Sequence, residues 1–217
     1  MMTIGIALMM ATIETAPTHA AQAIALPPPQ VDGGQSVERV LRARRSVREY
    51  GRGALTLAEV GQLLWAAQGI THDGLRTAPS AGALYPLELY LVSGRVSGLG
   101  VGVYHYIPAR HRLVPVLGGD VRAALAQAAL GQDCIADAAA TLVFTAVTRR
   151  TTRKYGERGL RYVDIEVGHA AQNVFLQATA LKLATVTVGA FDDDAVALVL
   201  HFPHEHAPRY LMPLGKH

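Results

Sequence analysis

The sequence predicts an α+β fold, and three observations support this prediction. Short apolar runs bounded by Gly or Pro, typical of strands, occur among segments whose apolar residues recur every three or four positions, typical of helices. These elements are mixed without the regular strand-helix alternation of a doubly wound sheet. The chain has 217 residues, of which 50% are hydrophobic and 17% charged, so it can bury one sizeable core.

The N-terminal third begins with a segment that we separate from the folded domain. Residues 4–13 are apolar and Ala21-Gln22-Ala23 is a pattern that signal peptidase could cut, but no basic residues precede the run. A cleaved signal and a frayed or mis-started N-terminus both remain open, and so do a cytoplasmic and an exported (periplasmic) location. We expect residues 1–35 to be this signal-like segment plus a Pro/Gly linker, and 36–217 to be the folded domain. No other stretch approaches the ~20 apolar residues that span a bilayer.

Capping residues mark the predicted helices. Ser36 caps a helix that ends near Arg44, and Thr56 with Glu59 forms a capping box for a helix that ends at Gly69. Asp120 and Asp192 cap two further helices, over 120–129 and 192–200. The predicted strands are 87–93, 101–106, 112–116, 142–147, 185–190 and 210–214. The first three are separated by Gly or Pro turns, which suggests an antiparallel meander.

Residues 153–194 form the stretch that organises the rest of the chain. A basic loop precedes a long helix, and a buried strand then ends in Gly189-Ala190, where small side chains let another group approach the backbone. The apolar face of the helix consists of Val163, Val167, Ala170, Val174, Ala178 and Leu181. Its other side carries Glu166, His169, Gln172, Asn173 and Gln177, which is too polar for a lone buried helix. We therefore expect that side to meet a partner surface.

Basic residues form two clusters although the net charge is only +3. The clusters are Arg42, Arg44, Arg45, Arg48 and Arg52, and Arg149, Arg150, Arg153, Lys154, Arg158 and Arg161. Aromatic residues do not interleave with them, so local anion sites are favoured and nucleic-acid binding is not expected. Arg44, Arg45, Ser46 and Arg48 together suit a phosphate, because arginine presents a charged planar fork of donors. The alternative is a solvated basic helix end.

Three other stretches contain residues that could bind a ligand or a metal. Residues 77–86 are poor in bulk, so their backbone donors and the Ser80 hydroxyl could line a flat ligand, or they form an ordinary surface loop. The histidines and Glu205 of residues 201–206 could bind a metal, but an exposed loop is the simpler interpretation, and Asp192–Asp194 is better explained as a helix cap. We predict no metal site. The single cysteine, Cys134, excludes an intrachain disulfide.

Six motifs resemble the nitroreductase superfamily, and specifically its SagB-type (azoline, or thiazole/oxazole) dehydrogenases. They are RRSVREY at 44–50, LLWAAQGI at 63–70, TAPSAGALYPLELYLV at 77–92, KYGERGLRY at 154–162, GHAAQN at 168–173 and VGAFDDD at 188–194. The resemblance implies an FMN-dependent oxidoreductase with a four- to five-stranded, mostly antiparallel sheet flanked by helices. It also implies a homodimer with two flavins at the subunit interface.

The resemblance also assigns site residues. The stretch that holds the FMN phosphate and ribityl chain is matched by Arg44, Arg45, Ser46 and Arg48. The loop that meets the flavin from the other subunit is matched by Pro79, Ser80, Ala81, Gly82 and Leu84. The strand end that lies against the isoalloxazine ring is matched by Val188, Gly189 and Ala190. Some nitroreductases add a basic residue near the last strand, for which Lys216 is the candidate here.

Lys154-Tyr155 matches the Lys-Tyr pair of the azoline dehydrogenases. Hydride loss to a flavin is easier if a base takes a proton from the neighbouring atom, and a tyrosine can serve when a close ammonium stabilises its phenolate. Without the resemblance, this pair would be read as a snorkelling cation and a packing ring.

The substrate is a small molecule or a peptide, and three activities remain open. One is dehydrogenation of a heterocycle or similar C–N bond, one is nitro or quinone reduction by NAD(P)H, and one is flavin binding without turnover.

Overall fold

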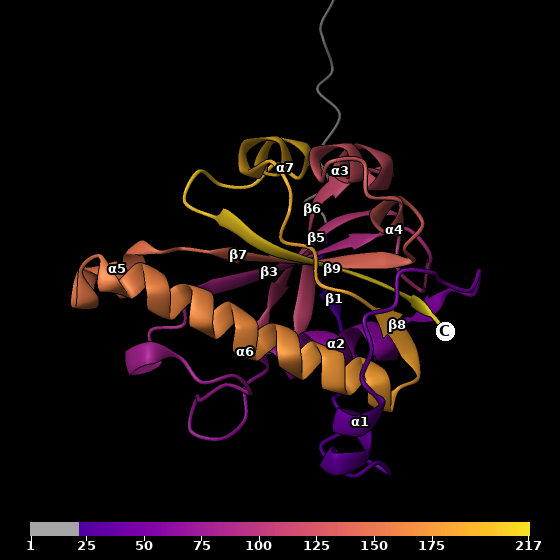
Figure 1. Ribbon diagram of the computed structural model, residues 1–217, viewed down its shortest axis with the longest axis horizontal. Coiled ribbons are helices and arrows are strands. Elements are labelled where there is room, and N and C mark those ends of the chain that lie inside the picture. The colour runs from indigo at the N-terminus through magenta and orange to yellow at the C-terminus, as the bar shows by residue number, and fades with distance from the viewer. Residues whose placement is uncertain (1–21) are drawn as a thin grey trace, which may run out of the picture.

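A seven-stranded sheet runs through the middle of the computed structural model, which describes residues 22–217 (Figure 1). Its order is β1-β6-β5-β3-β7-β9-β8, and every neighbouring pair is antiparallel. The strands are β1 (Ile24–Ala25), β3 (Leu87–Ser93), β5 (Gly102–Ile107), β6 (Arg112–Gly118), β7 (Ala140–Ala146), β8 (Leu183–Thr185) and β9 (Ala207–Lys216). The α+β class and the antiparallel sheet are confirmed. Five strands have six residues or more, and the short edge strands β1 and β8 extend the expected four- to five-stranded sheet.

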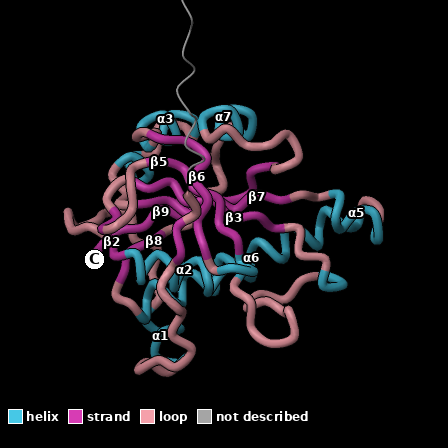
Figure 2. The backbone as a smooth tube through the Cα atoms, turned by 180° about the vertical axis from the view of Figure 1, so that it is seen from behind, coloured by secondary structure: helices cyan, strands magenta, loops and turns pink. Residues whose placement is uncertain are grey.

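Helices cover both faces of the sheet (Figures 1 and 2). α2 (Leu57–Gln68) and α6 (Arg158–Ala180) pack on one face, and α3 (Arg122–Ala128), α4 (Asp133–Ala136) and α7 (Asp193–Val199) pack on the other. β7 lies between these two layers and all seven of its residues are buried, which explains its continuous apolar run. The remaining elements are α1 (Val37–Ala43), β2 (Leu55–Thr56), β4 (Val96–Ser97), α5 (Arg149–Tyr155) and the 3-10 turns η1 (Ala81–Ala83) and η2 (Pro108–Arg110).

The capping predictions are confirmed for three helices and wrong for one. Ser36, Thr56 and Asp192 each accept a hydrogen bond from a backbone N–H in the first turn of their helix. α3 starts instead after Val121. Asp120 lies one residue too early to cap it, and its carboxylate binds the Arg122 guanidinium and backbone N–H.

Two predictions about residues 153–194 are corrected by the structure. The basic segment before the long helix is not a loop, because Arg149–Tyr155 forms α5. The polar side of α6 does not face outward as a whole. Glu166 is only 2% exposed. Asn173 donates to the Thr77 carbonyl, and Gln177 accepts from Gln62, so both side chains are used within the same chain. His169 and Gln172 are exposed and remain available to a partner.

The predicted strand over 185–190 is also shorter than expected. β8 ends at Thr185, and only an isolated bridge between Val188 and Leu211 continues the pairing.

The predicted linker packs against the domain. Ile24–Ala25 pairs with Arg112 and Leu113 of β6, and Leu26 is 7% exposed. The Gln30 N–H donates to the Gln62 side chain of α2. The apolar run of the signal-like segment lies outside the described residues. Within residues 22–217, no helix is long and apolar enough to cross a membrane.

Candidate functional site

The arginine stretch lies where the chain leaves α1 and runs beside β8. The Val47 N–H donates to the Thr185 carbonyl at 2.9 Å, which fixes the stretch against the sheet edge. The Arg44 guanidinium carbon lies 5.1 Å from the centre of the Phe175 ring of α6. Arg45 donates to the carbonyls of Arg42 and Arg44, so this side chain also caps the end of α1, as the alternative interpretation expected.

Arg48 is exposed at the mouth of an open cavity of about 570 Å³, whose lining includes Tyr50, Arg52, Arg95 and Asp137. A second cavity, of about 460 Å³, is lined by Ala43, Arg45, Val47, Thr179, Lys182, Leu183 and His217. Among the described residues, no carboxylate forms a salt bridge with Arg44, Arg45 or Arg48. In the described part of the chain, these three guanidinium groups are thus not held in ion pairs, which fits the phosphate of a ligand.

Val188, Gly189 and Ala190 lie near the same edge of the sheet. Val188 exchanges two backbone hydrogen bonds with Leu211 of β9, and the Gln132 side chain donates to the Ala190 carbonyl. Gly189 and Ala190 are exposed. Because these two residues present little side chain, the backbone there can meet a flat ring.

The loop at Pro79–Leu84 is tightly structured. The Ser80 hydroxyl accepts from the Tyr85 N–H at 2.9 Å, and the Ser80 carbonyl accepts from the Ala83 N–H at 3.0 Å. Gly82 has a φ of 64°, which favours glycine. A Cβ at this position would lie 2.8 Å from the Tyr155 hydroxyl oxygen and 3.0 Å from Lys154 Nζ. The structure therefore brings the loop and the Lys-Tyr pair together.

Within the pair, the Lys154 ammonium lies 5.4 Å from the centre of the Tyr155 ring, and the Tyr155 ring meets the Tyr162 ring edge-on at 5.2 Å. Lys154 is exposed and Tyr155 is half-buried, so both can reach a molecule bound over the loop.

α5, which carries the pair, is anchored to the sheet through Arg150. This guanidinium donates to the Tyr85 carbonyl at 3.0 Å and to the Glu88 carboxylate. Glu88 is also 2.8 Å from His105 Nε2. Burial favours the neutral acid, but the hydrogen bonds from His105 and Arg150 outweigh it and lower the pKa of Glu88 to about 2. The anchor is therefore ionic at neutral pH.

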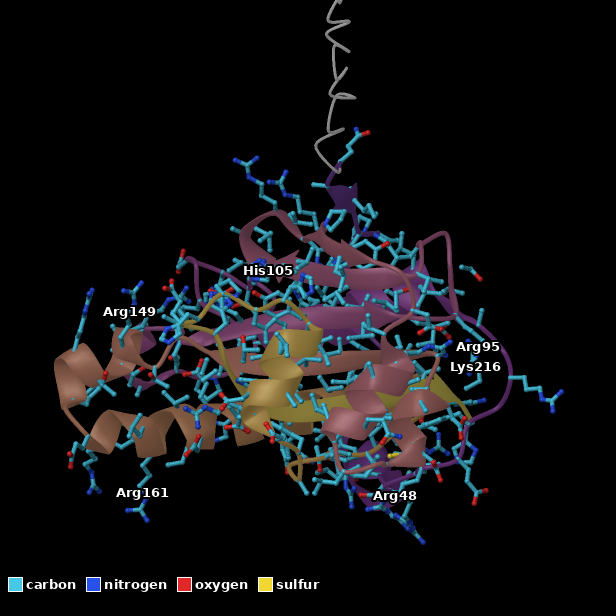
Figure 3. All side chains as sticks on the ribbon, turned by 90° about the horizontal axis from the view of Figure 1, so that it is seen from above. Arg48, Arg95, His105, Arg149, Arg161 and Lys216 are labelled. Atoms are coloured by element: carbon cyan, nitrogen blue, oxygen red, sulfur yellow. The ribbon has the colours of Figure 1, made fainter. Side chains whose placement is uncertain are left out.

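The arginine stretch and the loop with the Lys-Tyr pair lie beside different parts of α6. The loop at 79–84 and α5 lie by its N-terminal half, whereas Arg44 contacts Phe175 near its C-terminal end. The cavity beside the loop is lined by α6 residues up to His169, and Phe175 lies six residues further along, which is ~9 Å along the helix axis. Figure 3 shows Arg149 of α5 near the left end of the molecule and Arg48 at the bottom, right of the centre. None of the three cavities described here is lined by residues of both groups.

Sequence reasoning missed Glu166 as a site residue. It lines a cavity of about 300 Å³ together with Pro79, Ser80, Ala81, Tyr162, Ile165 and His169. The sequence spacing could have indicated that Glu166 is buried, because it lies three residues after Val163 and directly before Val167, on the flank of the apolar face. A carboxylate at such a boundary can face either way, and packing against the loop decides its direction.

Lys216, the candidate phosphate contact, and His206, a candidate metal ligand, each contact another residue of the chain. Lys216 Nζ lies 2.6 Å from Glu59 Oε1, so this ammonium is paired within the chain. His206 is hydrogen-bonded to the Tyr90 hydroxyl at 2.7 Å. Among the described residues, no group of three or more His, Cys, Asp or Glu could hold a metal ion.

The chain is similar to several known proteins in sequence and in fold. Residues 41–216 match the nitroreductase family model. The protein of Methanocaldococcus jannaschii named "Putative nitroreductase MJ1384" is 51% identical over 181 residues, which cover 83% of this chain and 90% of that protein. A solved structure from Ralstonia eutropha JMP134 with the same description has a TM-score of 0.80 at 26% identity, covering 91% of this chain and 90% of that one.

The structure of the E. coli microcin synthetase McbBCD complex with truncated pro-MccB17 bound is also similar. Its TM-score is 0.68 at 25% identity, over 89% of this chain and 77% of the matched chain. McbC is one of several SagB-type relatives of the chain. Since the family model covers most of the sequence and the fold agrees, the chain belongs to the nitroreductase family of oxidoreductases.

Proposed function

We propose that this protein is an FMN-dependent dehydrogenase of the SagB type, in which residues 36–217 form the flavin-binding domain and two copies share each flavin. The observation that supports this most directly is the position of Lys154 and Tyr155 against Gly82, in the loop that the family resemblance assigns to the flavin. The substrate would be a small molecule or peptide with an oxidisable heterocycle or C–N bond.

The cofactor site would draw its parts from two chains. In this proposal Arg44, Arg45, Ser46 and Arg48 of one chain bind the phosphate and ribityl chain, and Val188, Gly189 and Ala190 of that chain lie against the ring. The loop made of Pro79, Ser80, Ala81, Gly82 and Leu84 comes from the partner, with Lys154 and Tyr155 beside it. The lack of ion pairs at these arginines among the described residues supports the first part, and the separate cavities of the two groups support the division between chains.

Lys154 and Tyr155 would then remove the proton that the substrate loses together with the hydride. A bound FMN would supply the hydride acceptor for the substrate. Tyr155 takes the proton from the adjacent substrate atom, and Lys154 stabilises the phenolate that accepts it. Ser80 and the backbone of its loop orient the substrate and exclude water from this proton transfer.

Reduction of a nitro or quinone acceptor by NAD(P)H is the second candidate. The name of the M. jannaschii relative favours it. A flavin-binding protein without turnover is the third, and the same experiment separates all three.

The test is an absorbance spectrum of the purified protein, followed by anaerobic addition of NADH, NADPH or a thiazoline-containing peptide. We expect a flavin band at ~450 nm that the peptide bleaches faster than either nicotinamide. Faster bleaching by a nicotinamide would support the reductase, and no bleaching would support binding alone. Absence of the band after reconstitution with FMN would refute the flavin assignment.

Mixed dimers test whether each site is shared. R48E and K154A disable opposite parts of the proposed site, so each homodimer should be inactive. After unfolding and refolding together, half of the dimers are mixed and each keeps one intact site, so roughly a quarter of the wild-type activity should return. If the mixture stays as inactive as the separate variants, the two parts act within one chain.

A further inference from the structure

Glu166 is a buried carboxyl group that the proposed chemistry does not use. It lies on α6, is 2% exposed, and faces the cavity that it lines with Pro79, Ser80 and Ala81. Its Oε1 atom is buried without a hydrogen-bond partner. A carboxyl oxygen left in this state costs free energy, so its position calls for an explanation.

The surroundings of Glu166 contain one arginine, one histidine and one tyrosine. Arg76 is the nearby positive charge, but its guanidinium donates to the Gln68 side chain at 2.7 Å and lies 4.7 Å from the centre of the Tyr85 ring. Tyr162 and His169, one turn away on α6, line the same cavity. Arg76 thus lies close enough to act through its charge and forms no salt bridge with Glu166.

Burial dominates the protonation of this group. It raises the pKa of Glu166 to about 7, against the lowering effects of the Ser80 side chain and of Arg76. In the unfolded chain the Glu166 carboxyl group ionises at about pH 4.5, whereas in the folded chain it ionises at about pH 7. Its burial therefore lowers the free energy of unfolding progressively between these pH values, and the full loss is reached above about pH 7. Near neutral pH the folded protein holds much of this residue as the neutral acid.

The neighbour of Glu166 in the loop is Ser80, whose hydroxyl fixes the turn. The Ser80 oxygen accepts from the Tyr85 N–H, which leaves its own O–H free to donate to a carboxyl oxygen. The other side of the same loop faces Tyr155 and Lys154 at Gly82. The loop is therefore supported from α6 on one side and from α5 on the other.

We propose that Glu166, buried between α6 and the loop, is a positioning residue that holds the Ser80–Leu84 loop closed on α6 in its flavin-facing conformation. This inference rests on the proposed function for its role, but the contact itself belongs to the chain alone. Opening the loop would hydrate the carboxyl group, so ionisation favours opening. Opening becomes about tenfold more frequent with each pH unit between about pH 4.5, where the hydrated carboxyl group ionises, and about pH 7, where the buried group ionises too, and it stays constant above that.

Amide hydrogen exchange of peptides covering residues 79–86 tests the proposal without any ligand, at pH 6 and pH 8.5 after correction for intrinsic rates. In the wild type, we expect opening to be at least about tenfold more frequent at pH 8.5. Glutamine has the size of glutamate and a carbonyl acceptor but no charge, so residues 79–86 of E166Q should stay protected from exchange at both pH values. E166A should lose protection at both. E157Q, an exposed glutamate at the start of α6, should follow the wild type.

FMN affinity gives the second readout. At pH 6 we expect E166Q to bind FMN like the wild type and E166A to bind about tenfold more weakly. Wild-type affinity should fall relative to E166Q at pH 8.5. Equal exchange and affinity in the wild type, E166Q and E166A would overturn the role of Glu166. If the wild type binds no FMN, the proposed function fails, and the exchange data still decide whether Glu166 holds the loop.

Discussion

Gly82 combines an unusual backbone conformation with close contact to the proposed catalytic pair. Its φ of 64° is costly for other residues, and the space beside it is filled by the ends of Tyr155 and Lys154. The sequence suggested only a loop of small residues at this position. The structure adds the reason for one of them: a side chain here would push the Lys-Tyr pair away.

Replacing Gly82 by alanine tests that reason. G82A should lose ~1 kcal/mol of stability from its backbone conformation and, in addition, lower turnover by about tenfold or more, because the pair must move. G98A is the matched control: Gly98 has a φ of 80° and an added methyl group would meet nothing within 4 Å, so this variant should lose similar stability and keep its turnover. Equal turnover in the two variants, measured beside urea unfolding, would contradict the contact.

At the scale of an element, α5 shows how a short helix is held in place. It has seven residues, too few to be stable alone, and its basic sequence gave no apolar stripe. Arg150 ties it to β3 through Glu88, and the buried Thr151 lies against the core side. The helix is therefore fixed by tertiary contacts, which is why the sequence suggested a loop.

Removing the charge of Glu88 should loosen α5. E88Q is expected to cost ~2 kcal/mol at pH 7, because the Arg150 guanidinium loses its ionic partner. The pKa of Glu88 is lowered to about 2, so this stabilisation is present above about pH 4.5 and is lost as the pH falls toward 2. Urea unfolding of E88Q and the wild type should therefore differ at pH 7 and converge near pH 2.

The exposed pair between Arg149 and Glu205 provides the control for this prediction. Both side chains are at least half exposed, so E205Q should change stability by less than ~0.5 kcal/mol at either pH. If E205Q and E88Q cost the same, the ionic anchor of α5 is no stronger than a surface contact.

At the scale of the whole molecule, α1 and α6 both expose large apolar side chains, and we propose that these lie on the surface where two copies meet. Val37 and Leu41 of α1 and Leu160 and Ile165 of α6 are between 46% and 61% exposed. Both helices border the proposed shared site, and α6 presents His169 and Gln172 on the same side. This surface is our proposed contact between the two copies.

A charge on this surface should separate the copies. I165E is expected to shift the protein from dimer to monomer and to reduce FMN binding, because the buried charge would find no partner. L198E places the same charge at a more exposed position on α7, 77% exposed on the opposite face of the sheet, and should remain dimeric. Size-exclusion chromatography with light scattering measures both. A dimeric I165E that binds FMN normally would place the contact elsewhere.

The sequence by itself determined the features that depend on local patterns: the α+β class, the Ser36, Thr56 and Asp192 caps, the apolar face of α6 and the family motifs. These signals are local because hydrogen-bonded caps and helical or strand periodicity span only a few residues. For the same reason, the cofactor-binding stretches could be proposed from their motifs.

Only the tertiary structure decided where these pieces meet. It turned Glu166 inward, placed Lys154 and Tyr155 beside Gly82, and used Lys216 in a pair with Glu59. It also packed residues 24–30 onto the domain. Each of these outcomes depends on contacts between residues far apart in the chain, and a polar side chain at the boundary of a helix face acquires its direction only from the surface that packs against it.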